Sequence, residues 1–88
     1  MKVTLGKEGL TKTWQQDFPE TVECCKCKGK ARIAFVAHEG MDGKRESDCI
    51  CRAHDNEGKG GYWPHDYCAV AVYFCRVCFE VTGRWNQA

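Results

Sequence analysis

Residues 23–35 read ECCKCKGKARIAF and place three cysteines within four positions, ahead of a glycine and a basic run. Such a cluster has three ordinary interpretations: a disulfide framework, a redox-active thiol pair, or half of a metal site. The pair Cys24-x-x-Cys27 is matched far along the chain by Cys75-x-x-Cys78. The choice between the three interpretations therefore depends on the rest of the sequence.

The chain is short of large apolar side chains for its length. Leu, Ile, Val and Phe make up 15 of its 88 residues, about 17 %, whereas a globular core becomes doubtful below roughly 20 %. A fold with so small a core needs disulfides or a metal to offset the entropy of ordering the chain. The eight cysteines can supply that stabilisation, and a formal charge of +1 with ten aromatic residues argues against disorder. We expect one domain over residues 1–88.

The N-terminal sequence predicts the cellular compartment. MKVTLGKEGLTKTW has neither a seven-residue apolar core nor a small-residue cleavage site. The longest apolar run, CAVAVYFC at 68–75, has eight residues, which is too short to span a membrane. We therefore expect a cytoplasmic protein, where clustered cysteines are more often metal ligands or redox thiols than structural disulfides. The even number of cysteines keeps a disulfide framework as an alternative.

Three segments have the composition of β-strands. Residues 31–37 (ARIAFVA) and 69–74 (AVAVYF) are rich in β-branched and aromatic side chains. In residues 78–85 (CFEVTGRW), Phe79 and Val81 alternate with polar residues, which is the pattern of a half-buried strand with its apolar side inward. No long amphipathic helix is evident, so we expect a β-rich domain.

The segments outside these strands differ in composition. Residues 1–20 are polar with scattered apolar positions, and we interpret them as an N-terminal arm that Pro19 ends. Residues 38–67 are rich in Gly, Asp, Asn and Ser, which favour turns. Thirty residues without regular structure are unusual in a compact domain unless something else orders them. We interpret 38–67 as an inserted loop region that a metal orders.

Each Cys-x-x-Cys pair adjoins a predicted strand. The short turn lets both sulfurs of a pair point to one side, at about the separation that two corners of a tetrahedral zinc site require. Two such knuckles predict a metal site formed by Cys24, Cys27, Cys75 and Cys78. Cys25 could replace Cys24 as a ligand, although the spacing favours Cys24.

These knuckles resemble those of the zinc ribbon family at Cys24, Cys27, Gly29, Cys75 and Cys78. The resemblance implies a ribbon-like antiparallel sheet and a structural zinc ion. Zinc ribbons often carry glycine directly after the second pair, where this chain has Phe79. The 47 residues between the pairs are also long for a simple ribbon, which implies an insertion.

A second set of metal-binding residue types lies inside the predicted insertion. Cys51-x-x-His54 is followed, after ten residues, by His65-x-x-Cys68. Two thiolates and two imidazoles form a known closed zinc site, so these four residues predict a second zinc ion. Cys49 could replace a ligand of this set, and histidines that are only solvated are the alternative to a metal site. His38 has no nearby cysteine and is expected to be an exposed residue at a strand end.

The sequence carries none of the common catalytic motifs. Sites with four protein ligands leave no position open for water, so they favour a structural metal. There is no G-x-x-x-x-G-K loop, no Ser/His/Asp motif, and no H-x-E paired with P-C-x-x-C as in deaminases. We expect no enzyme and infer no small-molecule substrate.

A rubredoxin-like iron electron carrier is the main alternative function. Paired Cys-x-x-Cys knuckles close to Tyr73, Phe74 and Phe79 resemble that family. Rubredoxin-like proteins usually carry glycine after both pairs and are strongly acidic, and this chain departs from both features. Zinc is therefore the metal we expect.

A regular series of cations suggests a possible partner. Lys26, Lys28, Lys30 and Arg32 recur at every second residue, so in an extended segment they would share one face and could contact phosphates. Four thiolates with one Zn²⁺ would change the formal charge from +1 to about −1, which gives little general attraction to nucleic acid. We therefore expect solvated cations that balance the thiolates, and a binding or adaptor module with a protein partner; nucleic acid is the alternative.

Overall fold

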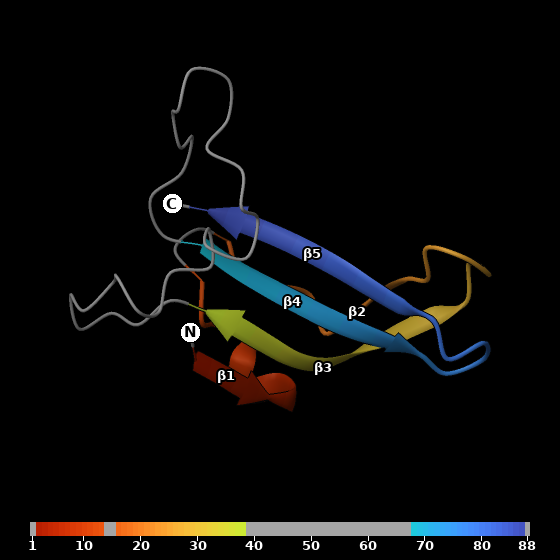
Figure 1. The fold of residues 1–88 in the computed structure, drawn as a ribbon, viewed down its shortest axis with the longest axis horizontal. Helices are drawn as coiled ribbons and strands as arrows, with labels where there is room; N and C mark the ends of the chain where they lie inside the picture. The colour runs from red at the N-terminus through yellow and green to blue at the C-terminus, as the bar shows by residue number, and fades with distance from the viewer. Residues whose placement is uncertain (1, 14–15, 39–67, 88) are drawn as a thin grey trace, which may run out of the picture.

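The computed structural model describes residues 2–13, 16–38 and 68–87, which form an antiparallel β-sheet (Figure 1). The elements are β1 (Lys2–Leu5), the 3-10 helix η1 (Gly6–Gly9), β2 (Thr21–Glu23), β3 (Lys30–His38), β4 (Cys68–Cys75) and β5 (Val81–Gln87). The strand order is β1-β3-β4-β5. β1 and β2 pair with the same edge of β3: β2 pairs with its first residues and β1 with its last ones. The prediction of a small, β-rich antiparallel sheet is confirmed.

The strands agree with the predicted segments at the centre of the sheet and differ at its edges. β3 and β4 cover 31–37 and 69–74 and extend slightly beyond both. β5 begins three residues later than expected, because 78–80 complete a turn. Residues 2–5, predicted as part of a polar arm, instead form β1 and pair with the end of β3. An edge strand obtains its stability from its neighbour's backbone, and so its own sequence identifies it poorly.

One side of the sheet, which we call the covered face, packs against the N-terminal segment. Phe18 belongs to the same buried cluster as Tyr73, and Leu10 packs against this cluster. The Tyr73 hydroxyl donates a 2.7 Å hydrogen bond to the Pro19 carbonyl oxygen. At Gly9 an added Cβ would lie 2.8 Å from a Val36 methyl carbon, so the absence of a side chain lets η1 approach β3 this closely. The buried cluster comprises Phe18, Val22, Cys24, Ala31, Val36, Ala69, Ala71, Tyr73 and Cys75.

The orientation of β5 is the reverse of the expected one. Thr82 lies opposite Tyr73 on the covered face and is 9 % exposed, whereas Val81 is 50 % exposed. The expectation that the side bearing Phe79 and Val81 is buried is therefore wrong. Residues that lie opposite one another in an antiparallel pair share a face, so the register with Tyr73 decides which side of β5 points inward.

His38 also differs from its prediction. It does lie at the end of a strand, but it is only 8 % exposed, and its Nε2 is hydrogen-bonded to Thr4 Oγ1 at 3.0 Å. The pairing of β1 with β3 brings these two side chains together, and this pairing was not predicted.

Some sequence predictions fall on residues outside the described ranges. These include Cys49, Cys51, His54 and His65, together with nearly all of the predicted insertion at 38–67. Within the described ranges, no helix is long and apolar enough to cross a membrane.

Candidate metal centre

Two hairpin tips form one end of the sheet. The first knuckle, residues 24–29, joins β2 to β3, and the second knuckle, residues 75–80, joins β4 to β5. Each is closed by the same backbone bond: Cys24 N–H to the Gly29 carbonyl oxygen at 2.8 Å, and Cys75 N–H to that of Glu80 at 2.9 Å. The two tips are therefore matched turns of equal length.

The match extends to the backbone dihedral angles. Lys28 and Phe79, each directly after the second cysteine of its pair, have φ values of 65° and 64°. This left-handed region suits glycine, because a Cβ atom crowds the following carbonyl oxygen. The sequence departs from the zinc-ribbon pattern at Phe79, where glycine is common. The backbone there nevertheless has the conformation that glycine favours.

Backbone N–H groups in both knuckles point at the sulfurs. Lys26 N–H donates to Cys24 Sγ at 3.4 Å, and Val77 N–H donates to Cys75 Sγ at the same distance. Cys78 N–H also donates to Cys75 Sγ, at 3.5 Å. These donors stabilise negative charge on sulfur, which is the form that binds metals.

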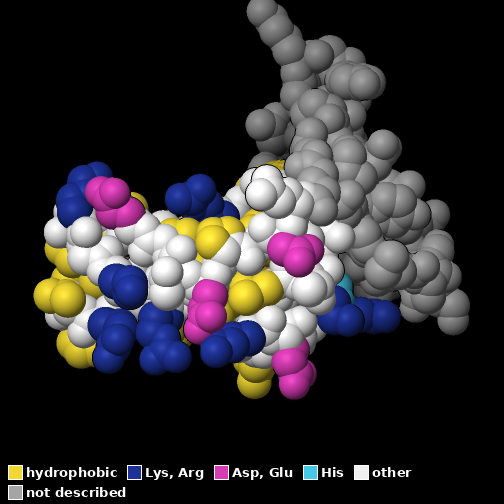
Figure 2. Space-filling view, turned by 180° about the vertical axis from the view of Figure 1, so that it is seen from behind, with side chains coloured by type: hydrophobic (Ala, Val, Ile, Leu, Met, Phe, Trp, Pro, Cys, Tyr) yellow, Lys and Arg dark blue, Asp and Glu magenta, His cyan; other side chains and the backbone are white. Residues whose placement is uncertain are grey.

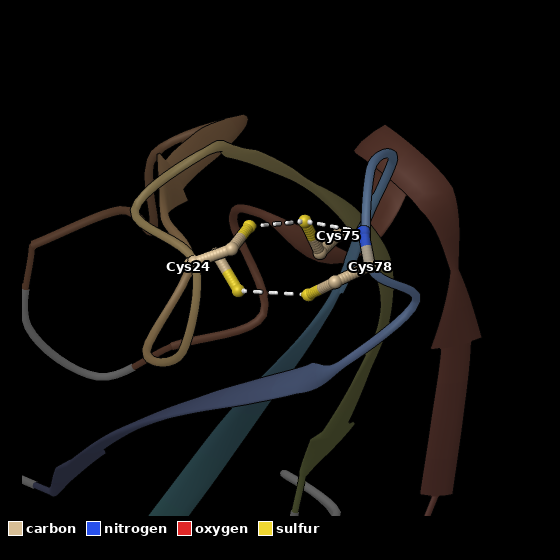
Figure 3. A group of neighbouring side chains, drawn as sticks. Cys24, Cys75 and Cys78 are labelled. Carbon is tan, nitrogen blue, oxygen red and sulfur yellow. Dashed lines mark hydrogen bonds between the residues drawn. The ribbon is translucent and has the colours of Figure 1, made fainter.

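The four sulfurs converge at a distance that suits a metal ion. The Cys24 and Cys78 side chains point toward each other (Figure 3), and their sulfurs lie 3.6 Å apart. Cys27 Sγ lies 3.4 Å from Cys75 Sγ. All four sulfurs lie within 4.8 Å of one another. A tetrahedral site with metal–sulfur bonds of about 2.3 Å places its sulfurs about 3.8 Å apart, and a disulfide bond would be about 2.05 Å long. The group could therefore hold one metal ion, and the spacing does not fit disulfides.

The pKa values of the thiols show what a cation would change. The N–H groups of Cys27 and Lys26 lower the pKa of Cys24 to about 6. The N–H groups of Cys78 and Val77 likewise lower the pKa of Cys75. The Glu80 N–H lowers the pKa of Cys78, but desolvation and the surrounding thiols outweigh it and raise that pKa to about 12. A cation bound at the group would therefore favour loss of the Cys78 proton.

Cys25 lies outside the group of four. It is exposed, and its thiol donates to the Val81 carbonyl oxygen at 3.5 Å. Its backbone N–H donates to Thr82 Oγ1 at 3.1 Å, which links the first knuckle to β5. The structure thus brings together Cys24, and not Cys25, with the other three cysteines.

The series of cations does not form the single strand face that the sequence suggested. Lys26 and Lys28 lie in the turn of the first knuckle, and only Lys30 and Arg32 belong to β3. Lys26 Nζ lies 3.8 Å from a Glu80 carboxylate oxygen, and Lys28 Nζ lies 3.8 Å from one of Glu23. The premise of one extended basic stripe is therefore wrong. Cationic side chains do gather at the knuckle end, beside hydrophobic ones, at the left of Figure 2.

Of the four residues predicted to bind a second metal, only Cys68 lies in the described ranges. It is the first residue of β4 and is buried. It is not part of the group formed by the two knuckles.

No protein-family model, curated protein or solved structure matches this chain. The assignment of the metal centre therefore depends on its geometry and on the chemistry of its thiols.

Proposed function

We propose that this protein is a structural zinc-binding protein of the zinc-ribbon kind, and that it serves as a small binding or adaptor module. The observation that supports this proposal is the convergence of four sulfurs from two matched knuckles. Four thiolates complete a tetrahedral coordination shell, which leaves no position for a substrate or a reactive water molecule. A metal held in this way joins the β2–β3 hairpin to the β4–β5 hairpin, and we propose no catalytic role for it.

Zinc is the ion that we propose for this site. Tetrahedral sites with four sulfur ligands hold either zinc or iron. The near-neutral charge of the chain and the absence of glycine at Lys28 and Phe79 speak against a rubredoxin-like electron carrier. N–H groups that point at sulfur are compatible with both metals, so the identity of the ion is decided by experiment.

The test is metal analysis of protein purified without added metal, combined with its absorption spectrum. Zinc at the knuckles gives a colourless protein, whereas iron bound to four thiolates gives a red one. Cys27→Ser should remove the ion that the knuckles bind. Cys25→Ser is the matched control, because it makes the same change in the same turn at a thiol outside the group, and it should leave metal content unchanged. Disulfide-bonded protein without metal would contradict the proposal.

A second zinc ion is a further part of the proposal. Cys51, His54, His65 and Cys68 are its proposed ligands, with Cys49 as the possible replacement. Native mass spectrometry should then find two zinc ions per chain, and Cys68→Ser should reduce the number to one. A single zinc ion, unaffected by Cys68→Ser, would remove the second site and leave the knuckle site intact.

We propose a protein partner in the cytoplasm for this module. Lys26 and Lys28 each lie near a carboxylate, so part of the cationic charge at the knuckle end is already balanced. Nucleic acid is the alternative partner, and salt-dependent retention on a nucleic-acid column would favour it.

A further inference from the structure

The side of the sheet opposite the covered face, which we call the open face, carries an ordered apolar surface. Cross-strand pairs form three rows on it. The row nearest the knuckles contains Phe74 and Val81; the next contains Leu5, Phe35, Val72 and Gly83; and the third contains Val3, Ala37, Val70 and Trp85. Each residue of a row lies opposite its neighbours, so these side chains share one side of the sheet.

Large aromatic side chains lie on this open face as well: Phe35, Phe74 and Trp85. The covered face combines Tyr73 and Val36 with alanine at 31, 69 and 71. Leu5 is 73 % exposed and Val3 is 56 % exposed. In Figure 1 the N-terminal segment passes behind β4, on the covered side. A sheet that is apolar on both faces needs a layer on each of them.

We propose that two copies of this chain pack the open faces of their sheets against each other. The exposure of this face agrees with such an occupant, because its five most exposed apolar residues lie between 42 % and 73 % exposed: Val3, Leu5, Phe74, Val81 and Trp85. An apolar patch of several hundred Å² is as large as the largest patches of ordinary monomers and approaches the ~800 Å² that each partner of a standard interface contributes. Two stacked sheets would then form a sandwich with the large side chains between its layers.

The charge and shape of the open face also favour a second copy. Arg32, which lies opposite Phe74 at the knuckle end, is the single charged residue in these rows. The next pair toward the knuckles is Glu23 with Lys30, whose charges are opposite, so the face has little net charge to attract a charged partner. A Cβ added at Gly83 would meet no atom within 4 Å, so there is space over β5 for an inserted side chain. A surface that is apolar over most of its area is complementary to itself, as an isologous two-fold interface requires.

The test is the mass of the metal-loaded full chain in solution, measured by sedimentation equilibrium over a range of concentrations. We expect twice the chain mass of 10.0 kDa. Val81→Lys and Val3→Lys each place two lysines in the dimer interface, one from each copy, and should raise its dissociation constant by roughly a hundredfold or more. Val77→Lys is the matched control, because Val77 is 71 % exposed at the tip of the second knuckle, away from the three rows, and this variant should stay dimeric.

Metal content and amide dispersion of each variant show whether it folds, and Val3→Lys decides the question if Val81→Lys does not fold. A wild-type mass of one chain at every concentration would overturn the proposal. A dimer that survives both Val3→Lys and Val81→Lys would also overturn it, as would a dimer that only Val77→Lys dissociates. None of these outcomes depends on which metal the knuckles bind, so the dimer and the zinc site are tested separately.

Discussion

Phe79 combines a left-handed backbone conformation with an aromatic side chain that is 82 % exposed. Both features are unfavourable in an isolated domain, because the Cβ atom strains the turn and the ring stays in water. Lys28 has the same backbone conformation at the matched position of the first knuckle, but its side chain is suited to solvent. Nothing in the described structure explains the aromatic ring at Phe79.

Phe79→Gly should therefore stabilise the protein. We expect the free energy of unfolding to rise by about 1 kcal/mol, because glycine adopts a positive φ without a Cβ clash. Denaturant titration at a fixed metal concentration measures this change. Gly6→Ala makes the reverse change, from glycine to a residue with a Cβ at positive φ: Gly6 has φ 64° and open space around it, so the substitution should destabilise the fold through backbone strain alone. Equal stability of Phe79→Gly and wild type would show that the turn carries no strain at this position.

Gly29 limits the space beside the metal centre. An added Cβ would lie 3.2 Å from Cys27 Sγ and 3.4 Å from a Val77 methyl carbon. Gly29→Ala should therefore displace the first knuckle from its metal-bound geometry and weaken metal binding by about tenfold, which corresponds to about 1.4 kcal/mol. Competition with a chelator of known affinity measures it. Gly83→Ala, where the added carbon meets nothing within 4 Å, is the control and should bind metal as the wild type does.

At the scale of the elements, the two hairpins are connected by more than their sulfurs. The bond from Cys25 N–H to Thr82 Oγ1 joins the first knuckle to β5, and Thr82 is buried. A hairpin alone is marginally stable in water, so contacts of this kind determine how the two hairpins are held together.

Thr82→Val should lower the free energy of unfolding by about 1–3 kcal/mol, because it keeps the shape of the side chain and leaves the Cys25 N–H without its acceptor. Thr21→Val in β2 is the matched control, since Thr21 is only partly buried and the Cys25 N–H donates to Thr82 rather than to Thr21. Denaturation of the metal-loaded variants compares the two. A smaller loss for Thr82→Val than for Thr21→Val would show that the bond contributes nothing to stability.

For the whole molecule, the metal and the fold should be inseparable. The covered face is built largely from alanines and from the cysteines themselves, so its burial stabilises the fold weakly. Structural zinc in small peptides binds with an apparent free energy of roughly 10–16 kcal/mol, comparable with the entire stability of about 5–15 kcal/mol of an ordinary domain.

Exhaustive chelation should therefore unfold the sheet, and adding zinc should restore it. The dispersion of amide signals in an NMR spectrum, recorded before and after chelation, measures this. Cys27→Ser should have the same effect as chelation, because it removes one corner of the site that joins the two hairpins. A well-dispersed spectrum of the metal-free protein would show that the core is sufficient without the metal.

Short-range patterns in the sequence were enough to predict the centre of this fold. The compositions of 31–37 and 69–74 identified β3 and β4, and the Cys-x-x-Cys spacing placed two knuckles beside strands. These features are local, because β-branched side chains favour extended backbone and a two-residue turn places its own two sulfurs. The predicted second set around Cys51 and His65 lies outside the described residues and stays a prediction.

Only the tertiary structure determined which strands pair and which side chains therefore share a face. The alternation of apolar and polar residues in β5 shows that its two sides differ in polarity. The pairing of Thr82 with Tyr73 determined that Thr82, not Val81, points inward. The same holds for β1, which forms because β3 offers it a free edge, and for the apolar side chains left on the open face. Strand pairing joins residues far apart in the chain, and its energy comes from the neighbouring strand, so a segment's own sequence does not reveal it.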